Sequence, residues 1–116
     1  MAAVILVIDD DDDFRASCVE ALIAAGYSAS SAASGPEALA LLRAATVLPG
    51  LLILDLMMPE MDGYAFRQAQ LRDTRLATIP VLIMTAGGEP ARDRLHGTTL
   101  LSKLAPLPKL FAATTR

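Results

Sequence analysis

Three short runs of apolar residues constrain the fold of this chain more than any other feature of its sequence. The runs are Val4–Ile8, Leu51–Leu54 and Val81–Met84. They are too short and too uniformly apolar for surface helices, whereas strands buried on both faces of a parallel sheet read in this way. Longer stretches with helical spacing separate them. The sequence therefore predicts strands that alternate with helices.

Start and stop signals place the first helices. The first is indicated by residues that recur at helical spacing, namely Phe14, Cys18, Leu22 and Ala25. Gly26 follows as a C′ residue. A second helix is predicted over about Glu37–Ala45, with Pro36 at its N1 position and Ser34 or Gly35 as its cap.

The remaining elements complete a (βα)5 pattern. A third helix is expected to open near Gly63 and to end before Thr74. Two weaker strands are predicted near Tyr27–Ser31 and Thr99–Ser102, and a short last helix near Pro108–Thr114. Right-handed crossovers then give a doubly wound α/β fold, a parallel five-stranded sheet with helices on both faces. Its binding crevice lies beyond the carboxyl ends of the strands.

Composition limits the class of protein. With 116 residues, the chain has the length of one domain, and 53% hydrophobic residues exclude disorder. A net charge of −3 argues against direct nucleic-acid binding. The only cysteine, Cys18, excludes an internal disulfide. Since no signal peptide and no apolar run of about 18 residues is found, we expect a cytoplasmic protein without a membrane span.

Polar residues follow the predicted strands. Asp9 and Asp10 follow the first and Asp55 the third, while Thr85 and Lys103 follow the fourth and fifth. Crowded carboxylates repel one another unless a cation neutralises them, and Mg²⁺ is the divalent ion that carboxylates and water usually hold. Asp9 and Asp10 would bind the metal, and Asp55 would be a nucleophile toward phosphorus. Asp11, Asp12 and Asp13 are expected to cap the first helix and complement its dipole.

These segments resemble a known family. Val4–Phe14, Leu51–Gly63 (LLILDLMMPEMDG), Pro80–Ala86 and Leu101–Lys103 are similar, in this order, to the receiver (CheY-like) domains of two-component response regulators. The resemblance covers nearly the whole chain, and its DLMMPEMDG segment is highly specific. It implies a single receiver domain over residues 1–116 and a flavodoxin-like sheet with strand order 2-1-3-4-5.

The resemblance also implies a role for each residue. Asp55 would accept a phosphoryl group from a phosphohistidine of a histidine kinase or phosphotransfer protein, in a Mg²⁺-dependent reaction. Asp9, Asp10, Asp55 and the backbone carbonyl of Met57 would hold the metal. Thr85 and Lys103 would contact the phosphoryl group, and the chain would act as a conformational switch. Such a domain catalyses only its own phosphorylation and dephosphorylation.

Three departures from the family pattern bear on signal output. Leu104 stands where the family usually has a proline in a cis peptide bond. A cis bond before a residue other than proline costs about 3–4 kcal/mol, so we expect a trans bond here. The loop that carries Lys103 would then point the lysine in a different direction. Leu100 replaces the usual Tyr or Phe of the rotamer switch. Pro90 and Gly97 confine the fourth helix to little more than Ala91–His96. We therefore expect an unusual output face.

Two other functions stay open at the level of sequence. A pseudo-receiver, an interaction module with lost switching, is favoured by the three departures and opposed by the complete set of acidic residues. A small Mg²⁺-dependent phosphohydrolase would usually need an acid two residues after its nucleophile, and that position is Met57. The sequence also leaves open which downstream partner the chain has and whether it forms a homodimer. It leaves open, too, whether the chain is a stand-alone regulator or part of a larger protein.

Overall fold

The sheet has five parallel strands in the predicted order. A computed structural model of the chain describes residues 4–85, 94–95 and 97–102. Its strands run in the order β2-β1-β3-β4-β5. Their bounds are β1 (Val4–Ile8), β2 (Ser28–Ala32), β3 (Leu51–Asp55), β4 (Val81–Thr85) and β5 (Thr98–Ser102). The prediction of a doubly wound parallel sheet with order 2-1-3-4-5 is confirmed.

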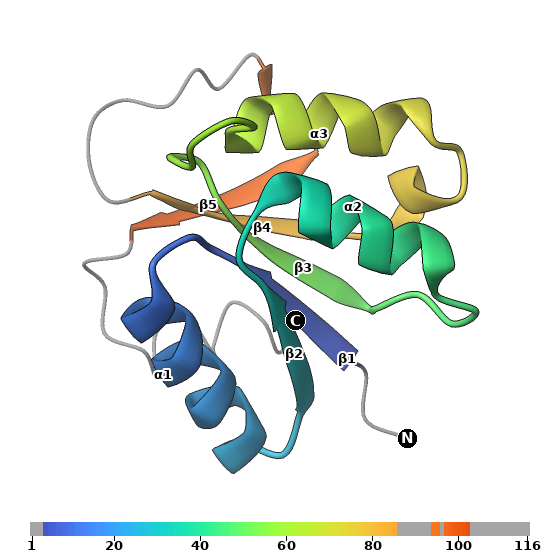
Figure 1. Cartoon of the computed structure of the whole chain (residues 1–116). Helices are drawn as coiled ribbons and strands as arrows, with labels where there is room; N and C mark the ends of the chain where they lie inside the picture. The colour runs from blue at the N-terminus through green and yellow to red at the C-terminus, as the bar shows by residue number, and fades with distance from the viewer. Residues whose placement is uncertain (1–3, 86–93, 96, 103–116) are drawn as a thin grey trace.

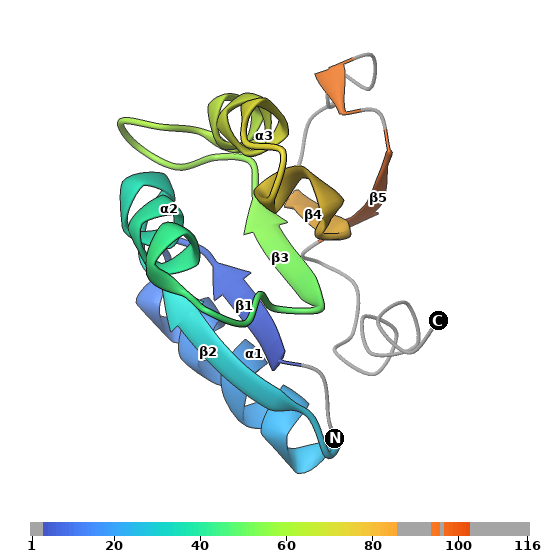
Figure 2. The ribbon, with the colours of Figure 1, turned by 90° about the vertical axis from the view of Figure 1, so that its right-hand side faces the viewer.

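Helices cover both faces of this sheet. They are α1 (Asp12–Ala24), α2 (Gly35–Ala44) and α3 (Gly63–Arg72), and a short 3-10 helix, η1 (Leu76–Thr78), leads into β4. Figure 1 shows α1 on one face of the sheet and α2 with α3 on the other. In Figure 2, which is turned by 90°, α1 lies partly behind β2. Each of these three helices begins beyond the carboxyl end of a strand, so the loops that follow β1, β2 and β3 lie at the same edge of the sheet.

Alternate side chains of the strands pack into two hydrophobic cores, one on each face of the sheet. The larger core lies under α2 and α3 and includes Leu6, Leu52, Leu54 and Phe66. The smaller core, under α1, includes Val7, Ile53 and Leu82 from the strands and Cys18 and Leu22 from the helix. Burial on both faces explains why the central strands carry an uninterrupted apolar sequence.

Side-chain caps fix where the helices begin. Asp11 caps α1 by accepting hydrogen bonds from the backbone N–H groups of Asp13 and Phe14, both at 3.1 Å. Ser34 caps α2 and Asp62 caps α3 in the same way. Gly26 takes a φ of 98° just after the C-cap of α1, which confirms its predicted C′ position.

The structure shifts some predicted boundaries by one or two residues. The second strand is Ser28–Ala32 rather than Tyr27–Ser31, and the fifth begins at Thr98. The second helix begins at Gly35, so Pro36 is its second residue and not its first. The predicted fourth helix, the last helix and the Lys103–Leu104 bond lie outside the described residues. None of the helices in the described ranges has the length and apolar character that a membrane crossing requires.

Two polar side chains of α3 are buried, which was not predicted. Gln70 is fully buried and donates through Nε2 to the carbonyl oxygens of Leu76 and Ile79, both at 3.0 Å. Arg67 is also buried and donates through Nη1 to Gln70 Oε1 at 2.8 Å. Burial lowers the pKa of the Arg67 guanidinium below its usual value. This polar pair fixes α3 to the η1 segment that leads into β4.

Candidate functional site

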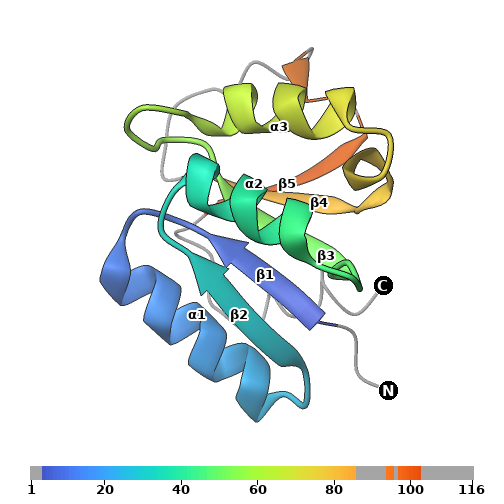
Figure 3. The same cartoon turned by 45° about the vertical axis from the view of Figure 1, so that its right-hand side comes forward.

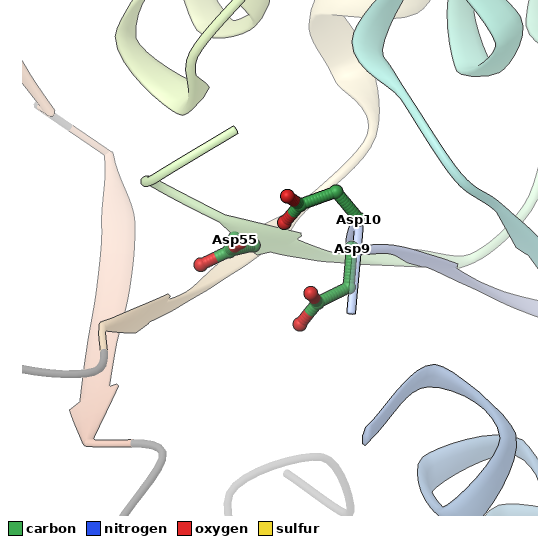
Figure 4. A group of neighbouring side chains, drawn as sticks. All are labelled: Asp9, Asp10 and Asp55. Atoms are coloured by element: carbon green, nitrogen blue, oxygen red, sulfur yellow. The ribbon is translucent and has the colours of Figure 1, made fainter. Parts of the chain in front are cut away.

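Three carboxylates meet at the carboxyl edge of the sheet. Figure 4 shows Asp9 and Asp10 beyond the end of β1, beside Asp55 at the end of β3. One carboxylate oxygen of each lies within 4.8 Å of the others. Because β1 and β3 are adjacent parallel strands, their carboxyl ends meet at the same edge. We call Asp9, Asp10 and Asp55 the carboxylate cluster.

Two members of the carboxylate cluster are buried. Asp9 is 1% exposed and Asp55 2% exposed, whereas Asp10 is exposed. The neighbouring backbone supports both buried groups, since Asp9 Oδ1 accepts from the N–H of Asp11 at 2.9 Å and Asp55 Oδ1 accepts from the N–H of Met57 at 3.4 Å. The cluster therefore has two fixed, buried carboxylates and one at the solvent boundary.

The loop after β3 packs tightly against Asp55. Gly63 donates its N–H to the carbonyl oxygen of Leu56 at 2.9 Å. A Cβ atom at Gly63 would lie 2.7 Å from the carbonyl oxygen of Asp55 and 2.8 Å from the Cα of Leu56. Only glycine fits this close approach of α3 to the backbone of Asp55. The sequence indicated Gly63 as a helix start but gave no sign of the contact.

The first turn of α1 supports the cluster from the other side. Arg15 Nη1 donates to the carbonyl oxygen of Asp9 at 2.9 Å, and Arg15 Nη2 forms an ion pair with Asp12 at 2.6 Å. Asp11, Asp12 and Asp13 cap α1 or lie in its first turn, as predicted. The contact of Arg15 with Asp9 was not predicted.

Cys18 of α1 is buried. Burial, with a smaller effect from the charge of Asp9, raises the pKa of its thiol to about 11.

The other predicted site residues are placed as follows. Thr85 ends β4, whose neighbour in the sheet is β3, and its side chain is half-buried. Met57 follows Asp55 by two residues and has an exposed side chain, 69% accessible. Leu100 lies on β5 opposite Ile83 and packs against the larger core. Lys103 is outside the described residues. The structure thus brings Asp9, Asp10 and Asp55 together and sets Thr85 at the same edge.

The carboxylate cluster fits a magnesium ion. Mg²⁺ binds oxygen ligands, keeps several waters and is commonly held by one or two carboxylates. Two buried carboxylates and one exposed carboxylate offer hard oxygen ligands and leave the solvent side open for water. Within the described residues no histidine or cysteine joins this group, so the donor set favours a hard cation over zinc.

Comparison with known proteins identifies the family. The family model of the response regulator receiver domain matches residues 5–108. The chain belongs to the receiver domains of response regulators. This receiver domain is 38% identical over 96 residues to the probable transcriptional regulator ycf27 of Cyanophora paradoxa. The aligned residues cover 83% of this chain and 38% of that protein. It is 41% identical over 98 residues to the response regulator PleD of Caulobacter vibrioides. The aligned residues cover 84% of this chain and 21% of PleD.

Solved structures agree with this assignment. The chemotaxis protein CheY4 of Vibrio cholerae superposes with a TM-score of 0.89 at 28% identity, over 100% of this receiver domain and 98% of CheY4. A signal receiver domain of a histidine kinase from Syntrophus aciditrophicus gives a TM-score of 0.86 at 29% identity, over 99% of this chain and 89% of that one. The sequence relatives are longer than this chain, which spans less than half of their length.

Family membership confirms the resemblance found in the sequence. A receiver domain is a component of two-component signalling. Receiver domains generally bind Mg²⁺ among acidic residues, and the carboxylate cluster is a group of acidic residues.

Proposed function

We propose that this receiver domain accepts a phosphoryl group from a phosphohistidine of a histidine kinase or phosphotransfer protein onto Asp55, in a Mg²⁺-dependent reaction. The observation that carries the proposal is the burial of Asp55 within 4.8 Å of two further carboxylates at the carboxyl edge of the sheet. Its Oδ1 accepts a hydrogen bond from the N–H of Met57, and Asp55 lies beside the carboxylates that would hold the metal with it.

The chemical step is a displacement at phosphorus. A carboxylate oxygen of Asp55 forms the new P–O bond while the P–N bond of the phosphohistidine breaks. The electron pair of that bond leaves with the imidazole, which takes up a proton if it emerges as the anion. The product is an acyl phosphate, which water later cleaves to restore Asp55 and release inorganic phosphate.

The residues around Asp55 divide the remaining work. Asp9, Asp10 and Asp55, with the backbone carbonyl of Met57, would hold the ion. When bound, Mg²⁺ neutralises charge on the transferring phosphoryl oxygens. Thr85 would donate its hydroxyl to a phosphoryl oxygen from the end of β4, and Lys103 would supply a positive charge. Phosphorylation then biases the position of Thr85, which is how the domain would act as a switch.

A mass measurement tests this proposal. The protein is incubated with Mg²⁺ and acetyl phosphate, and its intact mass is recorded beside an EDTA sample and the Asp55→Asn variant. Mass is the suitable readout because the chain has no tryptophan for fluorescence quenching. We expect the gain of one phosphoryl group, lost with EDTA and in Asp55→Asn. A folded protein that gains none from acetyl phosphate or from a cognate kinase would be a pseudo-receiver.

We also propose that residues 1–116 form one receiver domain, with no direct nucleic-acid partner of its own. Two of the longer relatives, from Synechocystis and Cyanophora paradoxa, are named as transcriptional regulators. If this receiver domain is part of such a protein, its phosphorylation would control an attached segment, and otherwise it would act on a separate partner.

A further inference from the structure

A hollow lies between the C-terminal ends of α2 and α3. It has a volume of about 420 Å³ and is lined by Arg43, Ala69, Arg72, Asp73 and Thr74. Figure 3 shows α2 and α3 side by side, and both helices end at the edge of the sheet opposite the carboxylate cluster. Sites for small ligands have volumes of about 300–1,000 Å³. The hollow is therefore separate from the phosphorylation site and large enough for a small ligand.

Two of the residues that line this hollow are arginines. Arg43 and Arg72 are exposed and lie in the last turns of α2 and α3. In the ranges that the structure describes, neither forms an ion pair; the ion pair found there joins Arg15 to Asp12. The whole chain has a net charge of −3, whereas this hollow has two guanidinium groups and one carboxylate in its lining.

The usual role of such arginines is to neutralise the C-terminal end of a helix. At α2 a third arginine already does so. Arg75 Nη1 donates to the carbonyl oxygen of Leu42 at 3.3 Å, and Arg75 Nη2 donates to that of Ala45. Capping of α2 therefore leaves Arg43 available for another partner.

The one acidic side chain of the hollow is also engaged. Asp73 Oδ1 accepts hydrogen bonds from the N–H of Arg75 at 3.0 Å and from the N–H of Leu76 at 3.3 Å. These bonds hold its carboxylate on the turn that begins η1. The side chains that line the hollow therefore carry one more positive than negative formal charge.

We propose that this hollow binds the phosphate group of a small anion. Guanidinium groups form paired hydrogen bonds with phosphate oxygens, and two of them match the charge of a phosphate dianion. Thr74 adds an exposed hydroxyl at the wall, where it can donate to a third oxygen. The group could come from inorganic phosphate or from a phosphate monoester such as a nucleotide, and these two sources share the same recognition chemistry.

The test follows the Nε–Hε resonances of the arginines by NMR. Inorganic phosphate or adenosine monophosphate is titrated into Asp55→Asn protein in EDTA, at constant ionic strength set with sodium chloride. We expect saturable shifts at Arg43 and Arg72. We also expect Arg43→Gln or Arg72→Gln to weaken binding about tenfold, as for the loss of a charged hydrogen-bond donor. Arg94→Gln, which removes an exposed arginine outside the hollow, serves as the matched control.

The outcomes separate cleanly. Saturation with both probes indicates recognition of the phosphate group itself, and saturation with adenosine monophosphate alone indicates a monoester; both support the proposal. Shifts that do not saturate, or that persist unchanged in Arg43→Gln and Arg72→Gln, would overturn it. All three arginines are exposed, so their variants should keep the fold, which thermal unfolding checks. Asp55 and the metal take no part, so failure here leaves the proposed phosphorylation untouched.

Discussion

The backbone of Asp55 leaves no room for a side chain at Gly63. We expect Gly63→Ala to lower the free energy of unfolding by about 2 kcal/mol, because the new Cβ meets main-chain atoms that cannot move without shifting the site. Gly35→Ala is a matched control. Gly35 also opens a helix, but its Cβ would meet only the flexible side chain of Met61, at 2.8 Å. Urea unfolding measures both, and equal losses would show that the close approach is unimportant.

Cys18 gives a second prediction at the residue scale. Its pKa is raised to about 11, chiefly by burial, so the folded state binds the thiol proton more tightly than the unfolded state does. Its contribution to stability is therefore complete below the usual thiol pKa and is lost as pH rises toward about 11. We expect the stability advantage of the wild type over Cys18→Ala to shrink over this range.

Urea unfolding of both proteins at a series of alkaline pH values measures that difference. The free energy of unfolding of Cys18→Ala is subtracted from that of the wild type, because tyrosines and lysines titrate in the same pH range and affect both proteins alike. A difference that stays constant from neutral pH to about pH 11 would mean that the thiol ionises as readily in the folded chain as in the unfolded one.

At the scale of elements, the buried pair under α3 fixes that helix to the segment before β4. Gln70→Leu would remove the acceptor of Arg67 and the donors to two buried carbonyl oxygens, so we expect a loss of about 3 kcal/mol. The double variant Arg67→Leu with Gln70→Leu should lose less than the sum of the two single losses, because each single variant strands polar groups. Urea unfolding of the four proteins measures the coupling; additive losses would argue against it.

The strands were predicted almost to the residue, and this has a physical cause. A strand such as β3 is buried on both faces, so burial alone sets its sequence. The edge strand β2 is made of serine and alanine, which burial hardly constrains, and its prediction slipped by one residue. The error is small because Gly26 fixes the end of α1 and thus limits where β2 can start.

Long-range contacts were the part that the sequence did not predict. Arg67 and Gln70 were not singled out in the sequence, yet both are buried. Their partners lie on η1, and sequence spacing carries no information on such pairs. The carboxylate cluster was predictable because parallel strands bring their carboxyl ends together whatever the rest of the chain does. The close approach of Gly63 to Asp55 depends on how the loop packs, which the sequence does not reveal.

At the scale of the whole molecule, metal binding at the carboxylate cluster would stabilise the folded state. Three carboxylates within 4.8 Å repel one another, so we expect Asp10→Asn to raise the stability of the metal-free protein. Mg²⁺ at about a hundred times its Kd should raise the unfolding free energy of the wild type by about 2.7 kcal/mol. Asp10→Asn should lose most of that increase.

Asp13→Asn is the control for this metal effect, because Asp13 is an exposed aspartate of the same run and lies outside the cluster. Thermal unfolding with and without Mg²⁺ measures the response of all three proteins. An equal response of Asp10→Asn and Asp13→Asn would point to general screening of acidic charge rather than to a metal site.

The most direct test of the central claim is transfer from a phosphohistidine donor, followed by peptide mapping. A histidine phosphotransfer protein that carries the phosphoryl group is mixed with this receiver domain and Mg²⁺. Borohydride then traps the acyl phosphate before digestion. We expect modification of the peptide that contains Asp55, and none with EDTA. Modification at another residue, or no transfer from several such donors to a folded protein, would contradict it.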